Sequence, residues 1–438
     1  MMRFSALLFL FTIIVQSNSS LAKIEGNAGL FARTFTEDEK ASEVYSFDGD
    51  LKYTKKLNKR WGLTLHPHVS VRNEENSENQ NFFIRGNDTG LYFKKDKRNI
   101  ISFGLQTHQF GLSQLFSPLN IVDTASFWAP LEPLPIGSPS VRWMYKTKKM
   151  RAFFSYLPYR FENLYPGTNS SWIPNIAPDS VEIGDNTILF PQEVEYRVED
   201  SIDLNSALRN NFAAGLSYDF KPFMIQAMLY DGVNVDPNVF LNLDLNLEDG
   251  TPGQEVLSVN NPVVVIPLYQ RVQRAAWGMR YTLPFKWRIV YEGSFTNSPE
   301  AANVTENPLL NTQSAEFTSQ LHTLGLEWGI PVGDTLLLGV VQAFYSERTN
   351  QSSLGFVSPF QEAYLFGLNW DVKRFVLEAG LLNSVSLNIK VVNAKVSFES
   401  FKDLNHSITY TSLDGDVLEL INGLFNKDNV IFSTSYKF

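Results

Sequence analysis

The chain has 438 residues, of which 44% are hydrophobic and 13% aromatic, with a net charge of -9 and no cysteine. The absence of cysteine excludes disulfides and thiolate metal sites, and the acidic balance argues against a nucleic-acid partner, which would require a basic patch. Beyond residue 22, no segment approaches the roughly 20 apolar residues of a membrane-spanning helix. Any crossing of a membrane by the mature chain therefore requires strands.

The N-terminus has the pattern of an export signal. Arg3 provides a positive charge, residues 4–15 are apolar except for Ser5 and Thr12, and Ser20-Leu21-Ala22 offers small residues for cleavage. We therefore expect residues 1–22 to be a signal peptide and residues 23–438 to form a single domain. The alternative, a retained N-terminal anchor, is disfavoured because the apolar stretch is short for a membrane helix.

Apolar and polar residues alternate strictly along many segments. Between Tyr45 and Tyr53 the odd positions are apolar or glycine, whereas the even positions are, in order, Ser, Asp, Asp and Lys. The same alternation recurs in 61–72, 275–283, 287–295, 364–370 and 375–381. A period of two indicates strands with one apolar and one polar face, as in a barrel that has lipid outside and water inside.

The connections between these segments alternate between short and long. Short ones are expected near 55–59, 94–98, 147–151, 221–222, 284–286, 331–335, 371–374 and 401–404, with nine others, mostly longer, between them. This pattern predicts an all-β transmembrane antiparallel β-barrel of about 18 strands, with 16 as the alternative, short periplasmic turns and long extracellular loops. The short turns are basic and flanked by aromatic residues, which indicates a membrane interface. The long loops are acidic, for contact with lipopolysaccharide through divalent cations or simply for solvation.

The loop over residues 113–140 contains five prolines and several large apolar residues. Proline stiffens a segment that cannot join a ladder, and the apolar residues disfavour open water. We expect this loop to fold into the lumen and narrow it, with Pro118, Phe127, Trp128 and Glu132 as constriction candidates. An external cap or a subunit contact is the alternative. The apolar stretch 262–267 is expected to pack over the mouth.

Three motifs within residues 100–240 carry a resemblance to a known family. They are Phe116-Ser117-Pro118-Leu119-Asn120, then 137–143 with Gly137-Ser138-Pro139, then Tyr156-Leu157-Pro158-Tyr159-Arg160-Phe161. They are similar to a poorly characterised family of large outer-membrane barrels, in which an Asn-Pro-Leu-Asp-like loop precedes a Gly-x-Pro strand and a Pro-containing strand end. The Asp of that loop is absent here, so its role is not carried over. The resemblance implies a barrel of porin type and no particular substrate.

The C-terminus resembles the last strand of Gram-negative outer-membrane proteins. Phe432, Tyr436 and Phe438 share one face of 430–438, whereas Thr434 departs from the aliphatic residue common there. The resemblance implies that these aromatic residues engage the barrel-assembly machinery during insertion.

The polar parity of the strands gives the candidates for the lumen. If the apolar parity faces lipid, the other faces water and lines a pore; the pore-lining candidates are Asp48, Asp50, Lys52, His66, His68, Arg72, Gln106, His108, Arg288 and Glu292, with Arg85 as a further one. Both charge signs occur, so no ion selectivity follows. No carboxylate or cysteine completes a metal site with the histidines at convincing spacing, and no nucleophile elbow is present, so we expect neither a metal, a cofactor nor an enzyme.

These observations predict an outer-membrane channel for the passive diffusion of small hydrophilic solutes, embedded in lipid and lipopolysaccharide. Two alternatives stay open: a structural or adhesive surface protein with a plugged barrel, and a substrate-specific transporter or exporter. A trimer and a monomer are both compatible with the sequence.

Overall fold

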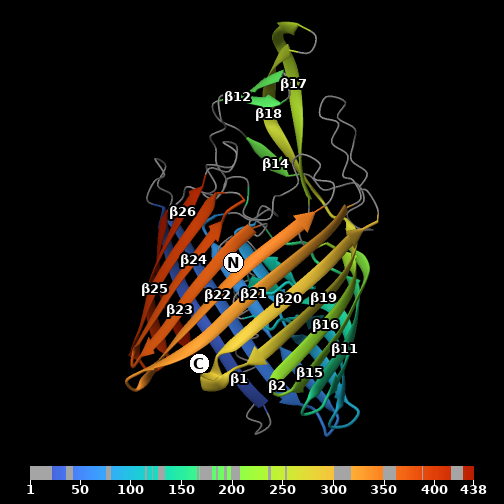
Figure 1. Cartoon of the computed structure of the whole chain (residues 1–438), viewed down its shortest axis with the longest axis vertical. Coiled ribbons are helices and arrows are strands. Elements are labelled where there is room, and N and C mark those ends of the chain that lie inside the picture. Colours follow the sequence, from blue (N-terminus) through green and yellow to red (C-terminus); the bar gives the residue numbers. More distant parts are fainter. Residues whose placement is uncertain are drawn as a thin grey trace, which may run out of the picture.

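A closed antiparallel barrel makes up most of the described chain (Figure 1). The computed structural model describes residues 22–35, 43–74, 80–113, 116–120, 122–126, 134–164, 167, 180–183, 186–191, 195–198, 208–234, 238–251, 254–299, 317–348, 362–386, 388–415 and 428–438. Within these residues the barrel has 18 strands, two of which are interrupted and therefore carry two labels each. They are β1 (Ala22–Phe35), β2 (Glu43–Lys56), β3 (Trp61–Leu65) continued by β4 (Pro67–Arg72), β5 (Phe82–Gly86) continued by β6 (Thr89–Lys94), β7 (Asn99–Gln106), β10 (Ser138–Lys146), β11 (Met150–Tyr159), β15 (Arg209–Phe220), β16 (Phe223–Val233), β19 (Arg271–Thr282), β20 (Arg288–Ser298), β21 (Phe317–Val332), β22 (Thr335–Arg348), β23 (Glu362–Val372), β24 (Phe375–Ser384), β25 (Ile389–Phe401), β26 (Leu404–Gly415) and β27 (Asn429–Lys437).

The two ends of the chain close the barrel. β1 pairs with β2 on one side and with β27 on the other, so that Ala32 lies opposite Phe432. The backbone of Phe438 exchanges hydrogen bonds of 2.8 and 2.9 Å with Gly26. Closure leaves neither of these strands with an open edge, which is the condition for a sheet to cross a membrane. The expected barrel and its count of about 18 strands are therefore confirmed.

The two interrupted barrel strands are broken at the same level. His66 separates β3 from β4, and Asn87 with Asp88 separates β5 from β6. The Asn87 amide donates to the His66 carbonyl at 2.8 Å, so the interruption is itself hydrogen-bonded. An irregularity of this kind bends a strand locally. Next to it, Gly104 has a φ of +134°, and a Cβ there would lie 2.2 Å from the Thr89 carbonyl oxygen, which restricts the position to glycine.

Eight short turns lie at one end of the barrel (Figure 1). The other connections lie at the opposite end and are longer, except for the one between Ser384 and Ile389. The short turns are 57–60, 95–98, 147–149, 221–222, 283–287, 333–334, 373–374 and 402–403, all at the predicted places. A short 3-10 helix, η1 (Pro284–Lys286), lies in one of them and is the one helix among the described residues. Among the described residues, no helix is long and apolar enough to cross a membrane. The expected signal peptide lies outside the described residues except for Ala22, with which β1 begins.

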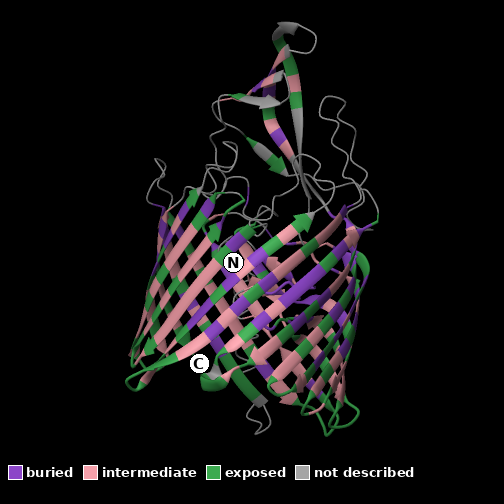
Figure 2. Ribbon diagram, in the orientation of Figure 1, coloured by how far each residue is buried: buried purple, intermediate pink, exposed green. Residues whose placement is uncertain are grey.

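Large apolar side chains cover the outside of the barrel. Leu30, Leu229, Leu324 and Phe432 all stand more than half exposed, whereas neighbouring positions along the same strands are buried or partly buried (Figure 2). Aromatic pairs lie near the short turns, such as Trp61 with Phe93, Phe220 with Phe223, and Phe375 with Phe398. An apolar outer band with an aromatic girdle beside short turns is the architecture of bacterial outer-membrane proteins, and it places the chain in that membrane.

A second sheet rises above the barrel at the long-loop end (Figure 1). It contains five strands, β12 (Ser180–Ile183), β13 (Asn186–Leu189), β14 (Tyr196–Val198), β17 (Asn238–Thr251) and β18 (Gln254–Leu268). β18 pairs with β17 in antiparallel fashion and with β13 and β14 in parallel. The prediction treated these residues as loops and expected 262–267 to pack over the mouth. Residues 262–267 are not a loop but part of β18, where Val263 is buried and its amide donates to the Glu195 carbonyl at 2.8 Å. That they pack over the mouth stays a prediction.

Candidate pore interior

The connection between β7 and β10 runs along the inner wall of the barrel. Its residues Phe110, Leu119 and Val122 are buried. They form one apolar cluster with inward-facing side chains of five strands, namely Phe153 and Leu157 on β11, Ala213 on β15, Met228 and Tyr230 on β16, Val272 and Ala276 on β19, and Phe317 on β21. Apolar residues on the inner face of a barrel would otherwise meet water, so this cluster fixes the connection to that side of the lumen. We call residues 107–126 the inner loop.

Polar contacts anchor the middle of the inner loop to two strands. Glu292 on β20 is fully buried, and its Oε1 accepts hydrogen bonds from the Leu112 amide at 2.7 Å and the Ser117 hydroxyl at 2.8 Å. Gln342 on β22 donates to the Phe116 carbonyl at 2.7 Å and accepts from the Ser113 hydroxyl at 3.1 Å. A buried side chain with bonds to backbone groups holds a loop in one register, because releasing it leaves those groups unpaired.

Arg160, directly after β11, anchors the next part of the inner loop. Its guanidinium is buried and donates to the Asp123 carbonyl at 2.9 Å, the Val233 carbonyl at 3.0 Å and the Tyr230 hydroxyl at 2.9 Å. The planar fork of five donors suits such a set of fixed acceptors. Arg160 thus connects the inner loop to the end of β16. The sequence-based candidates omitted it, although it lies within the third motif of the family resemblance.

His108 joins the start of the inner loop to β11. Its Nε2 lies 2.8 Å from the Ser155 hydroxyl, and its Nδ1 lies 3.5 Å from Asp123 Oδ1. The Asp123 carboxylate also accepts from the His108 amide at 2.5 Å. Burial lowers the pKa of the His108 imidazole, and the bond to Asp123 opposes that effect only in part. Neutral imidazole is therefore the form that this packing favours.

The wall opposite these anchors carries a ladder of acidic and histidine side chains. Between β2 and the interrupted strand made of β3 and β4, Asp50 lies 3.4 Å from His66, and Asp48 lies 3.9 Å from His68. Lys52 follows on the same face of β2, and Arg72 is buried at the upper end of β4. Within the described residues, no three His, Cys, Asp or Glu side chains gather as a metal site.

The structure separates the predicted lumen residues into two groups. Asp48, Asp50, Lys52, His66, His68 and Arg72 belong to the ladder. Gln106, His108 and Glu292 are buried beside the inner loop, and Arg288 pairs with Glu327 at 3.3 Å. Of the constriction candidates, Pro118 lies buried in a turn of the inner loop, whereas Phe127, Trp128 and Glu132 lie outside the described residues.

Comparison with known proteins gives a likeness in structure only. No family model matches the chain, and no curated protein matches it. Among solved structures, a BenF-like porin from Pseudomonas fluorescens Pf-5 is similar with a TM-score of 0.54 at 8% identity, over 95% of this chain and 98% of that one. OccK2 (OpdF) of Pseudomonas aeruginosa in complex with glucuronate is similar with a TM-score of 0.53 at 9% identity, over 95% of this chain and 98% of that one. OccAB3 of Acinetobacter baumannii is similar with a TM-score of 0.50 at 10% identity, over 95% of this chain and 99% of that one.

The chain has the porin fold. It shares this fold with the three solved structures over nearly their whole lengths. The expectation of a porin-type barrel is therefore confirmed, whereas identities of 8 to 10% carry no substrate from those proteins to this one.

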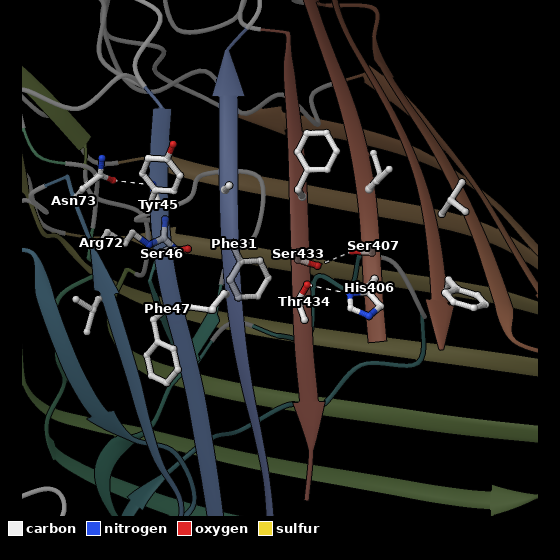
Figure 3. A pocket seen from close by; sticks show the side chains of 17 residues that line it. Phe31, Tyr45, Ser46, Phe47, Arg72, Asn73, His406, Ser407, Ser433 and Thr434 are labelled. Atoms are coloured by element: carbon white, nitrogen blue, oxygen red, sulfur yellow. Dashed lines mark hydrogen bonds between the residues drawn. The ribbon is translucent and has the colours of Figure 1, made fainter. Parts of the chain in front are cut away.

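One hollow of about 940 Å³ lies on the outside of this porin fold and not in the lumen. It is a trough that crosses β25, β26, β27, β1, β2 and β4 between two rows of outward side chains (Figure 3). His406 lies in the lower row and is hydrogen-bonded to Ser400 and Thr434 at 2.9 and 3.0 Å. Because its lining is mainly apolar and most of its large apolar side chains are exposed, such as Leu30, Ile408 and Phe432, the trough belongs to the membrane-facing surface.

Proposed function

We propose that this chain is an outer-membrane channel through which small hydrophilic solutes diffuse passively, and that it is not an enzyme. The observation that carries the proposal is the inner loop, which packs on one side of the lumen within a closed barrel. A porin interior is polar and partly narrowed by such loops, so that water and small solutes pass and larger ones do not.

The proposed passage runs between the inner loop and the ladder on β2 and β4. On that side, Asp48 and Asp50 lie beside His68 and His66, and Lys52 and Arg72 supply positive charge on the same two strands. The wall therefore carries both charge signs. A wall of mixed charge does not impose a large barrier on either sign of ion. We therefore propose a channel with size as its main criterion, in which the inner loop sets the limit.

The experiment is solute-dependent conductance of the refolded protein in planar bilayers, together with liposome swelling in sugars of increasing size. We expect stable single-channel steps and swelling rates that fall with solute size. A barrel that passes neither ions nor small sugars would reject the channel. Deleting residues 118–136 is the second arm, because an unchanged conductance after that deletion would reject the loop as the limiting element.

A second candidate function is favoured by the sheet above the mouth. The hairpin of β17 and β18 exposes polar side chains on one face, with Ser258 donating to Glu248 at 2.6 Å and Asn260 to Asp244 at 3.1 Å. A sheet that projects beyond the membrane surface suits a structural or adhesive role. For that function the barrel is plugged, so the refolded protein should show no conductance, whereas removing residues 238–268 should abolish its binding to other surfaces.

A further inference from the structure

Three consecutive short turns concentrate positive charge on one side of the periplasmic rim. Residues 55–60, 94–98 and 146–151 together contain twelve Lys and Arg residues against one carboxylate, Asp96. All twelve are exposed except Lys55, which is partly so. The other short turns are close to balanced, since Lys221, Lys286, Lys373, Arg374 and Lys402 stand among Asp219, Asp334, Asp371 and Asp403. We call the three turns the basic rim.

Backbone hydrogen bonds hold the three turns of the basic rim together. The Lys94 amide donates to the Arg60 carbonyl at 2.7 Å, and the Lys146 amide donates to the Arg98 carbonyl at 2.8 Å. Each turn is two strands from the next, hence roughly 10 Å away. The backbones of the three turns are therefore held side by side, so that their cations share one continuous surface.

The one carboxylate in the basic rim does not neutralise it. Asp96 accepts from the amides of Arg98 and Asn99 at 2.7 and 2.8 Å and from the Asn99 side chain at 2.9 Å. These bonds lower the pKa of Asp96 and commit its oxygens to the turn. Within the part of the chain that the structure describes, no Lys or Arg of the basic rim forms an ion pair, so these cations are available to an external anion.

The level of the basic rim identifies the anion. Outward-facing aromatic rings lie one residue from its cations: Trp61 follows Arg60, Phe93 precedes Lys94, and Tyr145 precedes Lys146. Such rings mark the boundary of the hydrocarbon region. The cations therefore lie where lipid phosphates lie, on the periplasmic side of the membrane.

We propose that the basic rim binds the headgroups of anionic phospholipids in the periplasmic leaflet and so surrounds this side of the barrel with them. Clusters of several Lys and Arg beside a membrane attract anionic lipid, and the attraction weakens with added salt. The shared chemistry is a phosphate group on a fixed cationic surface. Lipid phosphate and free phosphate are distinguished by the experiment, and an acidic polymer such as the cell wall is one of its outcomes.

The test compares two variants with equal numbers of neutralised cations. The rim variant carries Lys59→Gln, Arg60→Gln, Lys148→Gln and Lys149→Gln, and the matched control carries Lys221→Gln, Lys373→Gln, Arg374→Gln and Lys402→Gln on the balanced part of the rim. Each protein is reconstituted in phosphatidylcholine vesicles with spin-labelled phosphatidylglycerol or spin-labelled phosphatidylcholine, and the protein-associated fraction of each label is measured at low and high salt. Folding is checked first by the change of gel mobility on boiling.

We expect the native protein and the control to prefer phosphatidylglycerol at low salt, and the rim variant to lose about five-fold in that preference. Equal preference in all three proteins, or an equal loss in both variants, overturns the proposal. Binding of inorganic phosphate by the native protein in detergent, lost in the rim variant, would assign the patch to free phosphate instead. Unchanged lipid preference with loss of peptidoglycan binding would assign it to the cell wall. If the rim variant does not fold, the pair Lys148→Gln and Lys149→Gln replaces it, with a smaller loss expected.

Discussion

The anchoring of the inner loop by Glu292 and Gln342 leads to a direct prediction for conductance. Substituting both residues by Ala removes the acceptor of the Leu112 amide and the donor to the Phe116 carbonyl. The segment between these residues then has no polar attachment to β20 or β22 among the contacts described above. We expect it to leave the wall and fluctuate in the lumen.

The magnitude follows from the number of bonds that are lost. A buried donor or acceptor without its partner costs about 1–3 kcal/mol, so the two substitutions disfavour the anchored segment by about 4 kcal/mol. The apolar anchors remain, because burial of Leu119 and Val122 stabilises the loop by about 1.5–3 kcal/mol for each side chain. We therefore expect local release of the segment with the rest of the inner loop in place.

The assay is single-channel recording in planar bilayers. The double variant should show a changed mean conductance and larger open-channel noise than the native protein. Glu292→Gln keeps an acceptor oxygen at the same place and should behave as the native protein does. Gln226→Ala is the matched control, since Gln226 faces inward on β16 and makes none of the contacts of the inner loop described above. A folded double variant with native conductance and noise would refute the reasoning.

Three further predictions concern stability and assembly. Arg160→Met removes the guanidinium donor to the carbonyls of Asp123 and Val233, of which Val233 keeps the Tyr230 hydroxyl as a donor. The change should lower the free energy of unfolding by about 3 kcal/mol, measured by urea titration in detergent; native stability would contradict the anchoring role. Because burial lowers the pKa of His108, the unfolded chain binds more protons than the folded one between that lowered value and about 6.5, so stability should fall as the pH drops through this window. The same titration of His108→Gln should lack that component, and an equal slope in both proteins would argue against it. Phe438→Ala should reduce the yield of heat-modifiable barrel in cells but not refolding in vitro, as judged by gel mobility; equal losses in both would indicate a structural role only.

The barrel strands were predictable because their information is local. Alternation along 45–53 places Tyr45 and Phe47 outside and Asp48 and Asp50 inside, and this parity needs no knowledge of the partner strand. The turns were equally local: the Lys-rich stretch at 55–60 interrupts the alternation where the chain reverses.

The sheet above the mouth was not predictable from the same signal. β17 alternates as a barrel strand does, with Leu241, Leu243, Leu245 and Leu247 on one parity. Nothing in that pattern states whether a strand pairs within the barrel or above it. The parallel pairing of β18 with β13 and β14 joins segments that are distant in the sequence. The alternation of apolar and polar residues does not predict which distant strands pair.

The anchors of the inner loop were missed for a related reason. Gln342 lies 226 residues from its partner Phe116, and Arg160 lies 73 residues from Val233. The charged candidates were chosen by parity alone, which identifies the inner face but not what covers it. Glu292 was therefore expected to face the pore, whereas the structure shows it buried beneath Leu112 and Ser117.

The seam between β1 and β27 has a consequence for the order of events during folding. The strand that completes the cylinder, β27, follows the other described barrel strands in the chain, and its partner is β1. Until both are present, β1 has a free edge that could pair with another chain and aggregate. The cylinder can thus be sealed only after β27 has reached β1, and the interval before sealing is when this protein most needs protection from other strands.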